Sequence, residues 1–298
     1  MQCSKCKNES VVWQGYSGQH LCRQHFILDL EAKAKRAIRA HRWLCHNDHI
    51  GVAITGESGG YALLIFLKKL TAKRRDIRLS AIVIDTGMSG SAPADAMQWA
   101  ASEGIPCFSR SFKSAFGMTM EEIERQKGVA AREYHDVLSR ALIRRIAHAN
   151  GMTKIAYRTT ADEMACSVLF HMMAGTVEQM IFPQDAAYGA VPEIFPFMQV
   201  PEEEVRAYAG IHGVPIPPVP EPSRNDTLSG EVKTMLAAYD RNHPATRFAL
   251  VNLKENLIAA AGRHAQDLPG CPRCGQPCGE STCVNCRILD EFTRDVKT

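Results

Sequence analysis

Cysteine and histidine residues gather at both ends of the chain in patterns that are typical of zinc sites. The first set consists of Cys3, Cys6, Cys22 and His25, and the second consists of Cys271, Cys274, Cys283 and Cys286. Each set contains two pairs of ligands, and within each pair two residues lie between the ligands. Two such pairs complete a tetrahedron around one ion. No signal peptide is apparent before the first cysteines, and thiols in a reducing compartment favour metal over disulfides. We therefore predict one structural zinc ion at each end.

The composition is that of an ordinary globular protein. Of the 298 residues, 45% are hydrophobic and 22% are charged, which suits one large domain with small appendages. No apolar run approaches the roughly 20 residues that a membrane-spanning helix requires, so we expect a cytoplasmic protein that does not contact a membrane.

Basic side chains form two local clusters, although the net charge is only +3. The first contains Lys33, Lys35, Arg36, Arg39, His41 and Arg42, and the second contains Lys68, Lys69, Lys73, Arg74 and Arg75. Such clusters are found on nucleic-acid-binding faces and also on faces that simply contact solvent. Both interpretations stay open at this point.

The middle of the chain alternates between apolar strand patterns and helical patterns. Strands are expected at residues 50–54, 79–84, 105–110 and 154–157, and helices at 61–70, 94–103, 136–150, 162–174, 229–239 and 246–261. Apolar strands separated by helices predict a parallel sheet with helices on both faces. Ligands of such sheets bind beyond the carboxyl ends of the strands, here after Ile54, Ile84 and Tyr157.

Several longer motifs resemble a known enzyme family. They are Gly51–Gly56, Asp85–Gly90, Phe116–Ile123, Pro244–Phe248 and the two cysteine modules. Together they resemble the tRNA 2-thiouridine synthetases of the TtuA type, within the PP-loop ATPase superfamily, over essentially the whole chain. The resemblance implies a Rossmann-like α/β core of the adenine-nucleotide alpha-hydrolase (PP-loop) type at residues 27–265. Zinc modules at 1–26 and 266–298 would flank this core.

The resemblance also implies an enzyme that adenylates the C2 oxygen of a tRNA uridine and replaces that oxygen with sulfur. This reaction needs a pyrophosphate loop, which reads Ser-Gly-Gly-Lys-Asp-Ser in the family. The aligned residues here are Thr55, Gly56, Glu57, Ser58, Gly59 and Gly60. Ser58 stands at the Lys position and Gly59 at the Asp position, while Glu57 brings a carboxylate that repels phosphate. Backbone N–H groups alone can still hold phosphate, so binding of ATP with Mg²⁺ stays open.

The family also holds an iron–sulfur cluster on three cysteines. Arg132 and His135 occupy the positions of two of these ligands, and the segment 221–224 that aligns with the third contains no cysteine. From these positions alone we expect no iron–sulfur cluster of the family type.

Four further residues are candidates for chemistry in the cleft. Asp162 corresponds to a family carboxylate, yet a carboxylate at a helix N-terminus is also a capping residue. Cys166 lies one helical turn further and could carry a persulfide or simply pack as a small apolar residue. His135 could shuttle a proton or belong to an exposed polar turn. Asp85 at the end of the second strand could serve the cleft or form a turn.

The first functional hypothesis is therefore a divergent member of the tRNA-thiolation family. Such a protein would keep the fold, the zinc modules and binding to tRNA or a protein partner, without the family's ATP-dependent and cluster-dependent reaction. Two alternatives stay open. One is a nucleotide-dependent sulfur or nucleotidyl transferase with an altered site, and the other is a structural subunit that pairs with an active homologue. A homodimer is a further implication of the resemblance.

Overall fold

The computed structural model describes residues 1–55, 58–88, 93–128, 131–181, 191–214, 228–261, 271–273 and 282–293. Its centre is a parallel sheet with the strand order β5-β4-β3-β6-β7. The strands are β3 (His49–Ile54), β4 (Arg78–Asp85), β5 (Cys107–Ser111), β6 (Lys154–Ala156) and β7 (Glu193–Ile194). The predicted α/β fold with a parallel sheet is confirmed. The two-residue strand β7 was not predicted, because it is too short to show a periodic pattern.

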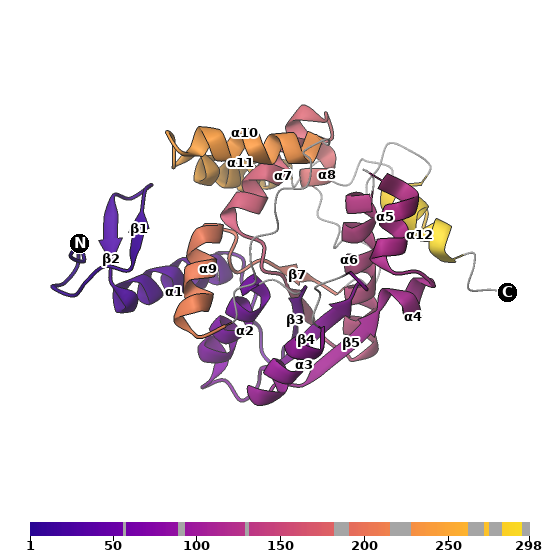
Figure 1. Ribbon diagram of the computed structural model, residues 1–298, viewed down its shortest axis with the longest axis horizontal. Coiled ribbons are helices and arrows are strands. Elements are labelled where there is room, and N and C mark those ends of the chain that lie inside the picture. The colour runs from indigo at the N-terminus through magenta and orange to yellow at the C-terminus, as the bar shows by residue number, and fades with distance from the viewer. Residues whose placement is uncertain are drawn as a thin grey trace.

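Helices cover both faces of this sheet (Figure 1). One face packs against α1 (Arg23–Ala40), α2 (Ser58–Thr71), α3 (Pro93–Ser102) and α9 (Glu202–Ile211). The other face packs against α4 (Phe112–Phe116), α5 (Met120–Lys127), α6 (Ala131–Ala149) and α12 (Val284–Thr293). The alternation of strand side chains explains the two layers, since Ile50, Val52 and Ile54 belong to the first and Ala53 to the second.

A third group of helices stands over the carboxyl edge of the sheet. It consists of α7 (Ala161–Met173), α8 (Val177–Ile181), α10 (Leu228–Asp240) and α11 (Thr246–Ala261). Helix α7 packs against α8, α10 and α11, which places this group at the top of Figure 1. Among the described helices, none combines the length and the apolar character that crossing a membrane requires.

The N-terminal module is a hairpin of β1 (Val12–Gln14) and β2 (Gln19–Leu21) that leads into α1. It is fastened to the core by Glu204 of α9, whose side chain is only 2% exposed. Tyr16 Oη donates a hydrogen bond to this carboxylate at 2.5 Å, and Lys33 forms an ion pair with it at 2.8 Å. The predicted boundary at residue 26 therefore lies inside a helix that the module and the core share.

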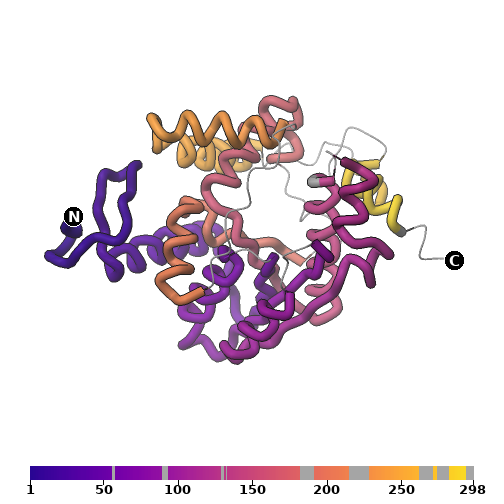
Figure 2. The backbone as a smooth tube through the Cα atoms, viewed as in Figure 1, coloured from indigo at the N-terminus to yellow at the C-terminus, as the bar shows by residue number. Residues whose placement is uncertain are grey.

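The C-terminal helix α12 docks on the opposite end of the molecule, as the tube in Figure 2 shows. Ile288 and Phe292 enter the core layer beneath α6. Tyr134 Oη donates to a carboxylate oxygen of Glu291 at 3.0 Å, and Lys127 forms an ion pair with Glu291 at 2.6 Å. The two cysteine-bearing modules thus flank the core on opposite sides.

Close contact between α2 and β3 depends on one glycine. A Cβ atom at Gly60 would lie 3.0 Å from the carbonyl oxygen of Ala53, whereas a Cβ at Gly59 would meet the movable side chain of Arg158. We predict that Gly60→Ala lowers the free energy of unfolding by about 2 kcal/mol, because the backbone must shift. Gly59→Ala is the matched control and should lose less than half as much in urea unfolding. Equal losses would contradict this explanation.

Candidate functional site

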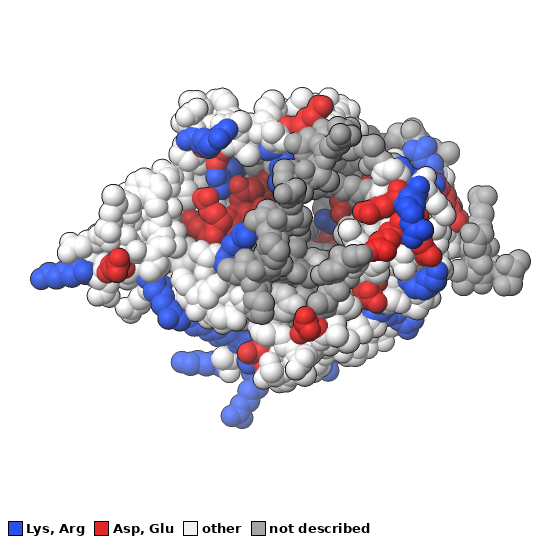
Figure 3. Space-filling model, viewed as in Figure 1, with Lys and Arg blue, Asp and Glu red and all other residues white. Residues whose placement is uncertain are grey.

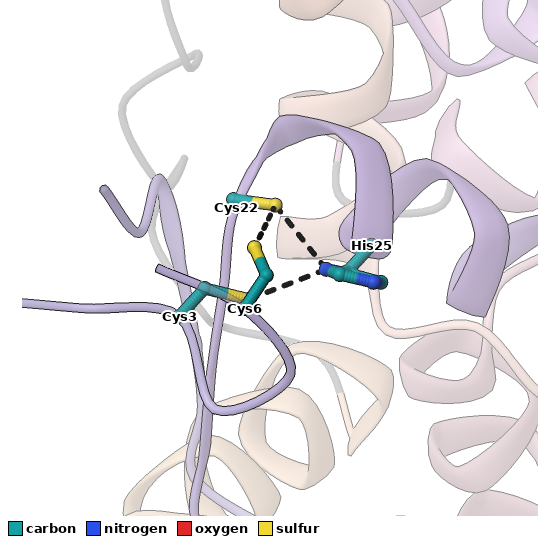
Figure 4. A group of neighbouring side chains, drawn as sticks. All are labelled: Cys3, Cys6, Cys22 and His25. Atoms are coloured by element: carbon teal, nitrogen blue, oxygen red, sulfur yellow. Dashed lines mark hydrogen bonds between the residues drawn. The ribbon is translucent and has the colours of Figure 1, made fainter. Parts of the chain in front are cut away.

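The N-terminal ligand set has the dimensions of a zinc site. Cys22 precedes α1 and His25 lies in its first turn, which brings both toward the knuckle that holds Cys3 and Cys6 (Figure 4). The Sγ atoms of Cys6 and Cys22 are 3.7 Å apart, and His25 Nδ1 lies 3.4 Å from the Sγ atoms of Cys3 and Cys22. Ideal tetrahedral zinc with its usual bond lengths requires about 3.8 Å and about 3.5 Å for these pairs. The four side chains therefore fit one zinc ion.

The C-terminal set is gathered as well, in the part that the structure describes. Cys271, Cys283 and Cys286 are buried, and their sulfur atoms lie within 4.8 Å of one another. The predicted fourth ligand, Cys274, lies outside the described residues. Three buried thiols in contact are a donor set for a soft metal centre, because thiolate ligands select zinc and iron–sulfur clusters.

The carboxyl edge of the sheet forms the predicted cleft. The direction of winding reverses between β3 and β6, which marks the point where ligands of such sheets bind. A cavity of about 530 Å³ opens at the ends of β4 and β5. It is lined by Asp85, Pro93, Met97, Ser109, Arg110, Ser111 and Ser114. Asp85 itself accepts a hydrogen bond from the N–H of Gly87 at 3.0 Å, as expected for a turn residue.

The phosphate-loop segment lies where the sequence predicted it, between β3 and α2. Thr55 is exposed after β3, and Ser58, Gly59 and Gly60 are buried in the first turn of α2. Gly56 and Glu57 lie outside the described residues. The stem of Arg158, from the loop after β6, lies beside Gly59, with Cδ 2.6 Å from the point where a Cβ of residue 59 would stand. Arg158 Nη2 in turn forms an ion pair with Glu163 Oε1 at 2.9 Å.

Asp162 connects two helices of the group above the sheet, α7 and α11, with α9. Its Oδ2 accepts a hydrogen bond from the backbone N–H of Glu202 at 2.7 Å, which satisfies a donor at the start of α9. Its Oδ1 forms an ion pair with Arg247 Nη1 at 2.9 Å. Asp162 does not cap α7, because Thr160 is the N-cap and forms a capping box with Glu163. The observed contacts of Asp162 therefore hold α7, α9 and α11 together.

Comparisons with known proteins agree with this architecture. The family model for the N-terminal LIM domain of the 2-thiouridine synthetase TtuA matches residues 2–27. The tRNA 2-thiolation protein NcsA of Haloferax volcanii is 27% identical, covering 98% of this chain and 99% of the relative. The tRNA-5-methyluridine(54) 2-sulfurtransferase of Thermus thermophilus is 24% identical, covering 100% of this chain and 94% of the relative. The chain is thus similar over its whole length to tRNA 2-thiolation proteins of the TtuA/NcsA type.

A solved structure of this family has the same fold. The U34-tRNA thiolase NcsA from Methanococcus maripaludis superposes with a TM-score of 0.76 at 20% identity, covering 98% of this chain and 96% of that one. That thiolase carries a [4Fe-4S] cluster. Our expectation from the sequence that no cluster belongs here is therefore wrong: a cluster is indicated for the TtuA/NcsA-type family. The error arose from counting cysteines only at aligned positions, although a fold can bring thiols together from other segments.

The remaining candidate residues do not converge on one site in the structure. Burial raises the pKa of the Cys166 thiol to about 11, and the carboxylates of Asp162 and Glu163 add to the effect despite the opposing charge of Lys233. A thiol with this pKa is protonated at neutral pH and a poor nucleophile. His135 is half-buried on α6, with Nδ1 3.3 Å from Asp136 Oδ1. The structure joins Asp162 to Arg247 instead of to these two side chains.

Sequence analysis did not single out Arg158 and Arg247. Arg247 belongs to the motif Pro244–Phe248, which matched the TtuA/NcsA-type family but suggested no role. Its charge at the start of a helix was a usable signal, because a cation there is unfavourable unless carboxylates surround it. Arg158 carried no local signal, since its contact with Gly59 joins segments far apart in the sequence.

Proposed function

We propose that this chain is a tRNA-binding protein of the 2-thiolation family whose phosphate loop does not support the usual ATP-dependent activation. The observation that supports the absence of ATP-dependent activation is the ion pair of Arg158 with Glu163, beside Gly59 at the start of α2. The positions of the family's Lys and Asp are Ser58 and Gly59, and both are buried in the helix. Arg158, whose stem contacts Gly59, is already paired with a carboxylate.

The similarity to tRNA 2-thiolation proteins and the surface charge support the binding of tRNA. One relative is a bovine cytoplasmic tRNA 2-thiolation protein that is 25% identical, covering 98% of this chain and 88% of the relative. Lys35, Arg39 and Arg42 line an open cavity of about 420 Å³ beside α1. Lysine and arginine side chains gather along the lower left of Figure 3, over α1 and α2. Cations on one face attract the phosphate backbone of a nucleic acid.

Binding to tRNA should depend on salt and on this basic face. We expect the double variant Arg39→Gln/Arg42→Gln to bind unmodified tRNA more weakly and to reduce the slope of log affinity against log salt by about 2, because two phosphate contacts are lost. The measurement is a filter-binding titration at several salt concentrations. Arg125→Gln, on the exposed face of α5, is the matched control. If the unchanged protein, the double variant and the control gave the same slope of log affinity against log salt, the basic face beside α1 would not be the tRNA-binding face.

Whether the protein binds ATP can be tested directly. We expect titration calorimetry with ATP and Mg²⁺ to show no binding for the protein as isolated. A second candidate function, a nucleotide-dependent transferase, is favoured by the placement of Arg158 near the N-terminus of α2, where phosphate binds well. In that case ATP would bind, and Arg158→Ala would weaken it. Heat with the unchanged protein that disappears in Arg158→Ala would therefore establish the second candidate.

Iron content is a separate measurement. The [4Fe-4S] cluster of the Methanococcus thiolase makes such a centre the group to search for in this chain. Among the described residues, the three buried thiols of Cys271, Cys283 and Cys286 lie within 4.8 Å of one another, which is the spacing of ligands around one zinc ion and is closer than thiolates on separate irons of a four-iron cluster. Iron and zinc analysis of anaerobically prepared protein, with and without Cys283→Ser, assigns the metal to this set.

A further inference from the structure

A row of four rings leads from the end of α1 to the carboxyl edge of the sheet. His41 stacks on Trp43 with ring centroids 4.4 Å apart and an interplanar angle of 12°. Trp43 meets the edge of Phe195 at 6.4 Å, and Phe195 lies nearly parallel to Tyr157 at 6.1 Å. Tyr157 directly follows β6 and Phe195 directly follows β7. The row therefore reaches the side of the cleft next to the point where the sheet reverses its winding.

The rings of this row differ from ordinary core aromatics in their exposure. Phe66 and Phe197 form a buried pair, with 1% and 0% of their surfaces exposed. In the row, His41 is exposed, and Trp43, Phe195 and Tyr157 each keep part of their surface open. These rings already contact one another, and the part of their surface that stays exposed is where a further planar group could pack.

Cations accompany the row along its length. The guanidinium of Arg140 lies over the ring of Tyr157, 5.2 Å from its centroid. Lys254 approaches the same region, and burial together with the charge of Arg140 lowers its pKa although Glu255 opposes the effect. At the other end, Arg39 and Arg42 line the cavity beside α1. An aromatic row flanked by cations is the combination that binds unpaired bases together with their phosphates.

The backbone at the start of the row is also unusual. Arg42 ends the turn after α1 with φ +53°, a left-handed conformation that favours glycine. This conformation lets the N–H of Trp43 donate to the carbonyl oxygen of Ile38 at 3.1 Å. An arginine at this position is conformationally unfavourable, and it adds a cation close in sequence to the first rings.

We propose that His41, Trp43, Phe195 and Tyr157 form a stacking platform for unpaired bases of a tRNA loop. Phosphates of the same strand would lie against Arg39 and Arg42, which line the open cavity at the start of the row. This inference rests on the proposed tRNA-binding function and adds where and how the strand is held. Every base presents a planar face, so the platform itself is tolerant of sequence, and a target uridine would be selected further into the cleft.

The fluorescence of Trp43 can report the stacking of bases on this platform. In the full chain with Trp13→Phe and Trp99→Phe, Trp43 is the remaining tryptophan. We expect oligouridine to quench its fluorescence, because bases stack on the indole. We also expect Trp43→Leu to weaken binding of oligouridine about ten-fold, while Trp43→Phe keeps most of the affinity. The matched control is Trp13→Leu, because Trp13 is 53% exposed and also packs on a histidine, His20, with ring centroids 4.3 Å apart, in the hairpin before α1.

The possible outcomes separate this inference from the proposed function. Intact tRNA that binds equally to Trp43→Leu, Phe195→Leu and the unchanged protein, all folded by circular dichroism, would overturn the platform and leave tRNA binding in place. Oligouridine quenching that depends on Trp43, without binding of intact tRNA, would support the platform and refute the proposed function. Loss of both would refute both. Loss of tRNA affinity only in the ring variants supports both.

Discussion

Cys22→Ser should release one zinc ion per chain and unfold the N-terminal hairpin. Cys22 is buried, with only 3% of its surface exposed, and its Sγ lies within 3.7 Å of Cys6 Sγ and 3.4 Å of His25 Nδ1. Strands of three residues cannot hold a hairpin on their own, so the metal supplies its stability. The expected zinc content falls from two ions to one, and trypsin should cleave within residues 1–22.

The core should survive this change. Phe26 and Leu30 of α1 are fully buried against the sheet and do not depend on the metal. The matched control is Cys45→Ser, because Cys45 is an exposed free cysteine away from both ligand sets. It should retain both zinc ions and resist trypsin. A Cys22→Ser protein that keeps two zinc ions, measured by mass spectrometry of the metal, would contradict the assignment of this ligand set.

The features that the sequence predicted well are those encoded within short segments. In the two ligand pairs that begin at Cys3 and Cys22, two residues lie between the ligands of each pair. The start of α1 brings the second pair into place. The strands β3 and β4 are continuous apolar runs, which is typical of strands buried on both faces. Helix α9 was missed, although three consecutive glutamates after Pro201 were a usable signal for a helix N-terminus.

The features that the sequence did not predict depend on partners from distant segments. The sequence left Asp162 open between capping and catalysis, whereas in the structure it bonds Glu202 of α9 and Arg247 of α11. The aromatic row combines residues that follow α1, β6 and β7, so no local pattern contains it. Strand order decides which loop ends meet, and spacing along the chain does not determine that order.

Arg247→Ala should destabilise the helices above the cleft by about 3–5 kcal/mol, because it leaves half-buried carboxylates without their counterion. The side chain of Arg247 is 12% exposed, and it pairs with Asp162 at 2.9 Å and with Asp240, which is 9% exposed. Glu203 lies 3.9 Å away, and burial already raises its pKa although Arg247 opposes the effect. Urea unfolding at neutral pH measures the loss.

Two comparisons make this prediction specific. Arg247→Lys should recover only part of the stability, because one ammonium cannot hold two carboxylates in the way that a planar guanidinium does. Arg241→Ala, an exposed arginine in the turn between α10 and α11, should change the free energy of unfolding by less than about 0.5 kcal/mol. Unpaired carboxylates protonate more readily, so the deficit of Arg247→Ala should shrink as the pH falls toward about 4. A deficit that stays constant with pH would show that Arg247 stabilises this region through packing and not through charge.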